Sequence, residues 1–525
     1  MSSAQVTGRA GTRGVLFAMC LALVLVVASV SALNLALPDL AVGLGANNTA
    51  LTWIADGYTV ALAALVLPLG AIGDRLGRRR VLIVGCIVFG IASAVAAQCQ
   101  SPTDLIVWRV IMGLGAAMVM PGTLSTITAV FPDEQRARGV ATWSGFAAAG
   151  AIIGLLLAGV LLQRWGWQSI FYTSAGVAAV AAIAAAILAP ETKDSQHRRF
   201  DLTGAVFTAV GIGALVFAII EGSDRGWTSI WVVVAVGACV LAFAGYTAHG
   251  LHAQHPLLDP RLFRLPGFRA GAVTVITQFM AVFGFFFVGL QYLQLILGYS
   301  PLVSAVALIP VAVVVLPTSL ITPWLVSRLG LNAVMTAGLV LLAAAMGWLS
   351  LLTVNSGYLP FVGGLVIAGL GTGLTGSTGT SAIVGSLPRG QQGVASAVND
   401  TTREVGSALG IAVMGSVFSN QYSRHLPSLD QLPAAAAAAV HDSAAGGLAA
   451  AKHLGPVGES LTGAIREAFM HGLSAALLVV AAVLVVAAIG CVIGAPSRPL
   501  SASNDTGTAE QELPAGSQPS AANAT

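Results

Sequence analysis

Apolar stretches of about 20 residues follow one another along most of this chain, with short polar segments between them. At about 1.5 Å per residue, each stretch is long enough to cross the roughly 30 Å of hydrocarbon in a bilayer as a helix. The stretches lack the alternation of barrel strands, so helices must satisfy their backbone groups there. We predict fourteen spans, near 14–37, 51–72, 81–99, 104–130, 139–162, 168–189, 202–221, 229–249, 269–297, 303–326, 332–353, 359–386, 394–419 and 467–494.

Composition supports an all-α polytopic membrane protein. Of 525 residues, 56% are hydrophobic and only 9% are charged, which is more apolar material than a soluble core needs. The first run, residues 15–37, could be a signal peptide, but it is longer than a usual signal core and more spans follow it. We therefore predict an uncleaved first helix. The five cysteines are odd in number and have no metal-ligand spacing, so we expect neither a disulfide framework nor a metal site.

Basic residues predict the orientation of the chain. If the amino terminus is cytoplasmic, seventeen of the 24 Lys and Arg residues fall on the cytoplasmic side and five on the outside. The remaining two, Arg109 and Arg403, lie inside spans. An even number of spans then places both termini in the cytoplasm, and we expect a multi-pass protein of the cell inner membrane.

One short segment, "GAIGDRLGRRR" (70–80), carries four of the arginines. Anchoring the loop between the second and third spans explains their charge, but not the order of glycines and Asp74. Glycines at 70, 73 and 77 remove side chains where two helices turn back on each other, and Asp74 can pair with arginines or cap a helix.

This segment resembles the loop 2–3 motif of the major facilitator superfamily, Gly-x-Leu-(Ala/Gly)-Asp-Arg-x-Gly-Arg-(Arg/Lys). The resemblance implies a conformational latch between two halves of the protein. The residues that match the motif are Gly70, Gly73, Asp74, Arg75, Gly77, Arg78 and Arg79.

A weak internal echo supports two duplicated halves. "VSRLGLNAVMTAG" (326–338) aligns without gaps on "GDRLGRRRVLIVG" (73–85). The expected organisation is a cytoplasmic tail, a six-helix half, a linker with two extra helices, a second six-helix half that includes an external segment, and a disordered cytoplasmic tail. The corresponding ranges are 1–13, 14–190, 191–267, 268–494 with 420–466 external, and 495–525.

Further segments, among them "LNLALPDL", "YLQLILGYSP" and "SAVNDTTREVGSALGIAVMGSV", are similar to the fourteen-helix drug:proton antiporters. The "WIADGY" form of the second span is closest to the branch that exports quaternary ammonium compounds.

A charge within a span is costly and indicates function. Asp56 lies about 8 Å from the outer end of its helix. It is either an interfacial acid facing water or a carboxylate that recognises a cation, and the resemblance favours cation recognition.

Arg109 lies about five residues into the fourth span, where it either snorkels to the interface or serves proton coupling, as the resemblance implies. The family pattern here is Arg-x-x-Gln-Gly, and this chain has Met112 in place of the Gln.

The densest charge within a span is the trio Asp400, Arg403 and Glu404. From an entry near Gly393, Asp400 lies roughly 10 Å deep and Glu404 near 16 Å, about the midplane. Arg403 can reach Asp400, so one reading is a locally neutralised pair. The other is a proton site, because hydrocarbon disfavours an ionised carboxylate. We favour Glu404 as the proton carrier, with Arg403 tuning it.

Small residues in "GAIIGLLLAG" form a strip for close helix packing at Gly150, Gly154 and Ala158. The resembled antiporter motif, Gly-x-x-x-Gly-Pro-x-x-Gly-Gly, is retained at Gly150, Gly154 and Gly159 but has Leu155 for its Pro. In the first span, Ser29 stands where many relatives place an Asp.

Together these features predict a proton-coupled efflux antiporter for lipophilic drugs or toxic compounds, with cations as the expected class. The alternatives are a dedicated exporter of one metabolite or antibiotic and, remotely, a membrane sensor.

"GTGLTG" (371–376) spells a dinucleotide fingerprint, but it lies inside a span with no preceding strand. With no nucleophile–base or Walker motif, we expect no enzyme and no cofactor other than the proton gradient. The expected partners are small molecules, protons and the bilayer, with no nucleic acid, and the protein is expected to be a monomer. The Ala-rich segment 420–466 is either a short external helical hairpin or a disordered loop.

Overall fold

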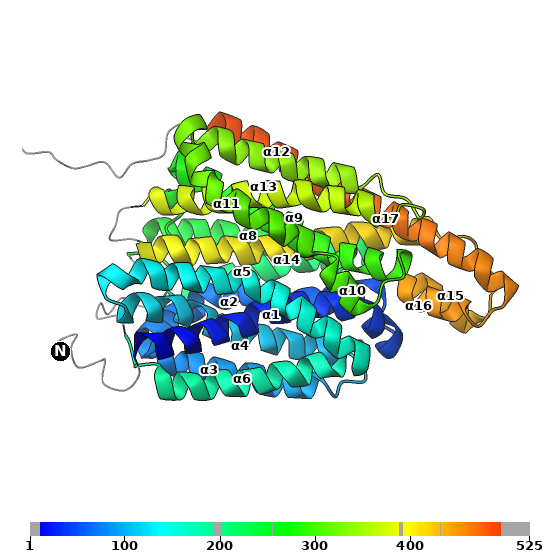
Figure 1. The fold of residues 1–525 in the computed structure, drawn as a ribbon, viewed down its shortest axis with the longest axis horizontal. Helices are drawn as coiled ribbons and strands as arrows, with labels where there is room; N and C mark the ends of the chain where they lie inside the picture. The colour runs from blue at the N-terminus through cyan, green and yellow to red at the C-terminus, as the bar shows by residue number, and fades with distance from the viewer. Residues whose placement is uncertain (1–10, 194–200, 255, 388–391, 431, 495–525) are drawn as a thin grey trace, which may run out of the picture.

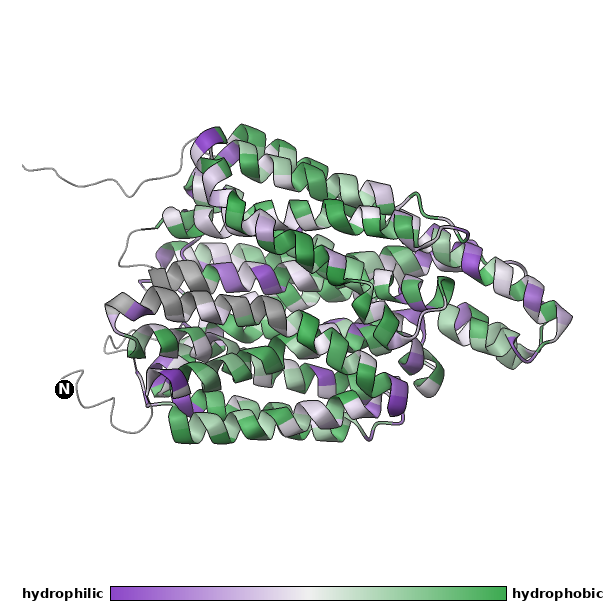
Figure 2. Ribbon diagram, viewed as in Figure 1, coloured by the Kyte–Doolittle hydropathy of each residue, from purple (hydrophilic) through white to green (hydrophobic). Residues whose placement is uncertain are grey.

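The computed structural model describes residues 11–193, 201–254, 256–387, 392–430 and 432–494. Side chains in parts of the helices near 133–149 and 392–397 are also outside the description. Within the described residues the structure is helical, with no strands. Long helices lie side by side along one direction, as Figure 1 shows. Hydrophobic residues cover most of their length in Figure 2.

Six long helices form the amino-terminal half, and two follow as an insertion. The first six are α1 (Thr12–Leu44), α2 (Asn48–Leu76), α3 (Arg78–Ala96), α4 (Pro102–Val130), α5 (Asp133–Arg164) and α6 (Gln168–Leu188). The inserted pair is α7 (Leu202–Arg225) and α8 (Ile230–His252).

The carboxy-terminal half contains more interrupted elements. They are the 3₁₀ helix η2 (Pro260–Arg264), α9 (Pro266–Gln291) with its π-helical extension η3 (Tyr292–Ile296), α10 (Pro301–Val306), α11 (Ile309–Leu329), α12 (Leu331–Leu349), α13 (Tyr358–Gly385), α14 (Gln392–Arg424), α15 (Ala434–Asp442), α16 (Ala444–Ala451) and α17 (Pro456–Gly494).

Twelve of the described helical segments are long and apolar enough to cross a membrane. All twelve coincide with predicted spans. The other two predicted spans correspond to α5, of which 150–164 is the apolar described part, and to α14, which carries several polar and charged residues. The all-α membrane architecture is confirmed, and the total of fourteen spans remains a prediction.

The two halves are packed in the same way. In the amino-terminal half α4 packs against α2 and α3, α1 against α5, and α3 against α6. In the carboxy-terminal half α13 packs against α11 and α12, α9 against α14, and α12 against α17. The halves meet where α2 packs on α14 and where α5 packs on α10, and α7 lies against both α2 and α14.

The sequence echo has a matching backbone. Gly77 joins α2 to α3 with φ +118°, and Gly330 joins α11 to α12 with φ +87°. Only glycine adopts such angles without strain, so the same tight turn is built at equivalent places in both halves. We call the end of the bundle with these two turns the turn end, and the opposite end, which carries α15 and α16, the hairpin end (Figure 1).

Several helix ends differ from the prediction. α17 begins at Pro456, eleven residues before the predicted span, because the helix continues past the apolar stretch through the exposed residues Glu459 and Glu467. The predicted span 303–326 is broken between α10 and α11, where Pro310 cannot donate a backbone hydrogen bond. Segment 420–466 contains the helices α15 and α16 and is not an extended loop. Residues 1–10 of the predicted amino-terminal tail (1–13) and the whole predicted carboxy-terminal tail (495–525) lie outside the described residues.

Candidate functional site

Asp56 lies on the inward side of α2 and has no solvent exposure. The Thr59 hydroxyl donates a hydrogen bond to its Oδ1, whereas its Oδ2 has no hydrogen-bond partner in the described structure. Burial excludes the alternative of an interfacial acid facing water. A carboxylate oxygen left unpaired at this depth is costly unless a ligand or a proton occupies it.

Arg109 reaches from α4 to the backbone of α2 just before Asp56. Its Nε donates to the Ile54 carbonyl at 3.0 Å and its Nη2 to the Ala55 carbonyl at 3.4 Å. The guanidinium lies 4.5 Å from the centre of the Tyr58 ring, in a cation–π arrangement. With only 1% exposure, the side chain does not snorkel to an interface.

Close approach of α2 and α4 makes this contact possible. A Cβ at Gly113 would lie 2.4 Å from the Tyr58 carbonyl oxygen, so any side chain there would push the helices apart. Met112 stands where the family has Gln, three residues after Arg109. It is buried, and its thioether side chain has no amide to hydrogen-bond with Arg109.

The charged trio of α14 is arranged differently from the expected pair. Asp400 is buried, whereas Arg403 and Glu404 are half-buried. Arg403 makes no ion pair with either acid in the described structure: its guanidinium lies 4.7 Å from the centre of the Phe279 ring on α9, and its Nε is buried without a partner. Arg403 nevertheless lies within electrostatic range of both acids, so the locally neutralised pair and the proton site both remain predictions.

Asp400 is instead connected to its own half through amides and hydroxyls. Asn399 hydrogen-bonds to Asp400, and the Thr380 hydroxyl on α13 donates to the Asn399 amide oxygen at 3.0 Å. This chain fixes the turn of α14 that carries the trio against α13.

The charged residues of the two halves meet at the contact between α2 and α14. Val405, next to Glu404, belongs to an apolar cluster with Ala63 and Ala64 of α2. Glu404 lies within electrostatic range of the Tyr58 hydroxyl. Glu404 is therefore placed near the Asp56, Tyr58 and Arg109 group, across the boundary between the halves.

The 70–80 segment forms a second polar cluster at the turn end. Arg78 pairs with Asp74 at 2.7 Å and donates to the Ser125 carbonyl of α4 at 3.0 Å. Arg79 donates to the Ala186 carbonyl of α6, and Arg80 lies 3.4 Å from Glu191. The partners within helices all belong to the amino-terminal half, and Glu191 lies just after α6, so the segment ties α2, α3, α4 and the end of α6 together. The latch between the two halves that the resemblance implies remains a prediction.

The small residues of α5 serve two contacts. Gly150 and Gly154 face α1, and a Cβ at Gly154 would lie 2.7 Å from the backbone of Ala28. Gly159 faces the other half, because its Cβ would lie 2.7 Å from the backbone of Leu302 on α10. One glycine motif therefore packs a helix pair within one half and also joins the two halves.

Sequence reasoning did not single out Glu221. This carboxylate on α7 is 7% exposed and accepts a hydrogen bond from the Trp53 indole of α2 at 2.8 Å. The sequence showed only an acid at the end of an apolar stretch. Acids are common at the ends of spans, so this position alone does not indicate a buried contact.

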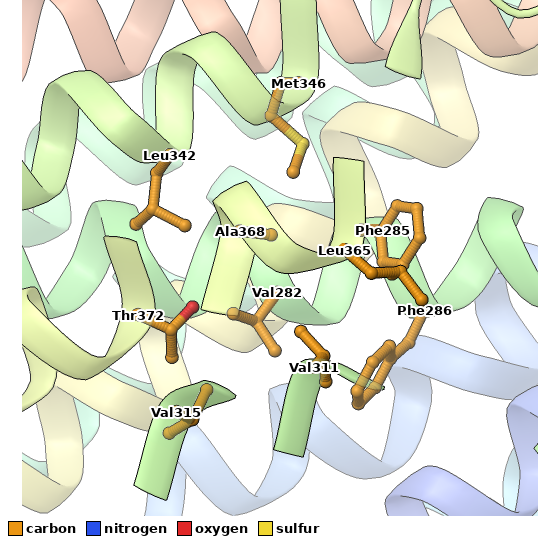
Figure 3. Close-up of a pocket in the computed structure, with 10 residues that line it drawn as sticks. All are labelled: Val282, Phe285, Phe286, Val311, Val315, Leu342, Met346, Leu365, Ala368 and Thr372. Atoms are coloured by element: carbon orange, nitrogen blue, oxygen red, sulfur yellow. The ribbon is translucent and has the colours of Figure 1, made fainter. Parts of the chain in front are cut away.

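Two pockets lie within the carboxy-terminal half, and none of the charged residues above lines them. The first, of about 60 Å³, is enclosed by α9, α11, α12 and α13 and is apolar except for Thr372, as Figure 3 shows. The second, of about 390 Å³, lies near the turn end and is lined partly by the hydroxyls of Ser327, Ser377 and Ser381. Only the second reaches the volume of a typical drug-sized site.

Two six-helix halves with equivalent packing and charges buried where they meet define the fold of a membrane transporter rather than an enzyme. Residues 19–411 match the family described as the Major Facilitator Superfamily. The chain belongs to this superfamily, which confirms the predicted resemblance.

Relatives of known designation are similar over most of the chain. One is the multidrug resistance protein Stp of Mycobacterium tuberculosis, 31% identical over 469 residues and covering 86% of each chain. Another is the methyl viologen resistance protein SmvA of Salmonella typhimurium, 31% identical over 463 residues, with 87% of this chain and 93% of SmvA covered.

A solved structure of a bacterial homologue of the human lysosomal transporter Spinster, inward-facing and unoccupied, has a similar fold. Its TM-score is 0.65 at 16% identity, covering 93% of this chain and 98% of that one. This likeness extends the fold assignment to nearly the whole chain.

Proposed function

We propose that this protein is a proton-coupled exporter of lipophilic drugs, with cations as its main substrate class. The observation that carries the proposal is Asp56, a fully buried carboxylate with an unpaired oxygen beside the boundary between the halves. A buried carboxylate with one unpaired oxygen attracts a lipophilic cation, because the apolar body of the cation fits the buried site and its charge replaces the lost hydration of the carboxylate. The designation of Stp supports export of several drugs, and that of SmvA supports recognition of an organic cation.

Proton coupling is proposed for the acids of α14. Glu404 is near the contact with α2, so its protonation removes a charge from the surface that the two halves share. Exchange of a proton for a substrate cation then alters the electrostatic balance between the inward-open and outward-open arrangements. Arg403, held on the Phe279 ring and without an ion pair in the described structure, remains available to stabilise either ionised acid.

The proposal includes the orientation. The turn end, with Arg75, Arg78, Arg79 and Arg80, is placed in the cytoplasm together with both termini, and the hairpin end faces outward. The protein is proposed to lie in the cell inner membrane as a monomer.

Substrate-dependent proton movement tests this function directly. Purified protein in liposomes should release protons when methyl viologen or a more lipophilic organic cation is added, and should move the cation uphill when a pH gradient is imposed. Absence of both responses, with correctly inserted protein, would favour a membrane sensor. A resistance profile over many drugs distinguishes broad export from export of a single metabolite.

Substitution of Asp56 by Asn is expected to discriminate between substrate classes. Asn preserves shape but removes the charge, so export of methyl viologen should fall about tenfold or more, whereas export of a neutral drug should change less than about twofold. The measurement is initial transport rate in liposomes for both compounds. Asp39→Asn, at an exposed position near the hairpin end, is the matched control. An equal loss for both compounds would assign Asp56 to folding or coupling.

Substitution of Asp74 by Asn tests the 70–80 segment. Four arginines remain, so insertion and orientation should be unchanged. Loss of the ion pair releases Arg78 from α2 and loosens the turn that Gly77 forms, and transport should slow several-fold. The readout is transport rate at matched amounts of inserted protein, with Asp104→Asn as an exposed control. Wild-type transport would leave the segment as a topology anchor only.

A further inference from the structure

The inserted helix α7 makes a buried polar contact with the helix that carries Asp56. Both carboxylate oxygens of Glu221 are occupied: Oε1 accepts from the Trp53 indole at 2.8 Å, and Oε2 accepts from Arg225 one turn further along α7. Glu221 is 7% exposed, so the contact is largely shielded from water. A charged acceptor in such surroundings makes a hydrogen bond of above-average strength.

Trp53 is three residues before Asp56, so both belong to the same turn of α2 and to neighbouring positions on its surface. The Trp53 ring also contacts Phe217 of α7, with ring centres 6.0 Å apart. The orientation of this turn is therefore fixed from two sides: Arg109 holds its carbonyls from α4, and Glu221 holds its indole from α7.

The contact of α7 with the other half is of a different kind. There Val216 and Ile220 of α7 pack with Ala408 and Ala412 of α14 in an apolar cluster. This apolar contact is non-directional, whereas the directional Glu221–Trp53 bond must break for α7 to leave α2. The helix α7 is therefore expected to move with the amino-terminal half.

We infer that Glu221 is a specificity-determining positioning residue, which acts through Trp53 to hold the turn of α2 that presents Asp56 to cationic substrates. The inference rests on the proposed function and extends it to the inserted helices. The inference assigns the inserted helices a role in the recognition of cations, in addition to their packing where α2 and α14 meet. Neutral substrates do not need Asp56, so their transport is independent of this contact.

Kinetics in liposomes test the inference, with methyl viologen as the cation and a neutral lipophilic dye as the reference. Glu221→Ala and Trp53→Phe should each raise the KM for methyl viologen about tenfold, with the maximal rate and the dye kinetics unchanged. Glu221→Gln retains an acceptor oxygen for the indole and should restore most of the affinity. The double variant should be no worse than either single variant, because both remove the same bond.

Two neighbours on α7 serve as controls. Asp224→Asn removes an exposed acid from the same end of the helix and should leave the KM unchanged. Arg225→Ala removes the ion pair but leaves the indole bond, and should have a smaller effect than Glu221→Ala. An unchanged KM in both Glu221→Ala and Trp53→Phe, additive losses in the double variant, or equal losses for cation and dye would overturn the inference. Failure of the wild-type protein to transport methyl viologen would instead refute the proposed function itself.

Discussion

Uphill export is expected to collapse when Glu404 is replaced by Gln, while substrate-for-substrate exchange survives. Gln is isosteric with the protonated acid, so the substitution fixes the neutral form at the contact between α2 and α14. The substrate still binds at Asp56, and downhill exchange needs no net movement of protons. Export driven by a pH gradient does require net proton movement. Export against a concentration gradient should therefore fall by at least about a hundredfold and lose its pH dependence.

The two transport modes are measured on the same liposome preparation, with and without an imposed pH gradient. Glu467→Gln, at an exposed position on α17, is the matched control and should behave as wild type. Asp400→Asn should be milder, because Asn399 and Thr380 already hold that turn in place. Uphill export with unchanged pH dependence in Glu404→Gln, together with its loss in Asp400→Asn, would move the proton site to Asp400.

The helical framework was predictable because length and hydropathy determine which segments can cross hydrocarbon. The same physics does not determine where a helix ends once it has left the apolar stretch. α17 therefore begins at Pro456 and not near 467, and α14 continues to Arg424. The break between α10 and α11 was visible only as Pro310, and two further prolines, at 317 and 323, lie within α11 without ending it.

Charged positions of the candidate site were predictable for a related reason. Asp56, Arg109 and the α14 trio are conspicuous because charge inside a span is rare. Their partners were not predictable from spacing. The i,i+3 relation suggested Asp400 as the partner of Arg403, but the structure supplies an aromatic ring from α9, 124 residues earlier in the chain.

The contact of Arg109 with backbone carbonyls shows a different limit of sequence reasoning. Every helix has carbonyls, and only the close approach at Gly113 makes two of them available to a guanidinium. Glu221 was overlooked because an acid at the end of a span is ordinary until a buried indole is found to donate to it. Both contacts join helices whose adjacency is a property of the whole fold.

The broadest loss, across every substrate class, is expected at Arg109, even for substitution by Lys. Lys retains the positive charge, but a single ammonium cannot reproduce the fork that reaches the carbonyls of Ile54 and Ala55 while stacking on Tyr58. The turn of α2 before Asp56 then loses its attachment to α4, and two carbonyls in a buried site lose a charged donor. Transport of every substrate class should fall about a hundredfold, with reduced thermal stability of the purified protein.

A second variant, Gly113→Ala, tests the spacing of α2 and α4 without changing the charge of Arg109. Gly113→Ala leaves Arg109 intact but places a Cβ against the Tyr58 carbonyl, so α2 and α4 must separate. The guanidinium of Arg109 then no longer reaches the two carbonyls of α2. Both variants should therefore show the same loss of transport, whereas Arg164→Lys at the exposed end of α5 should be silent. Normal transport by Arg109→Lys would show that its charge alone is required. A silent Gly113→Ala beside an inactive Arg109→Lys would show that the guanidinium acts without the close approach of the two helices.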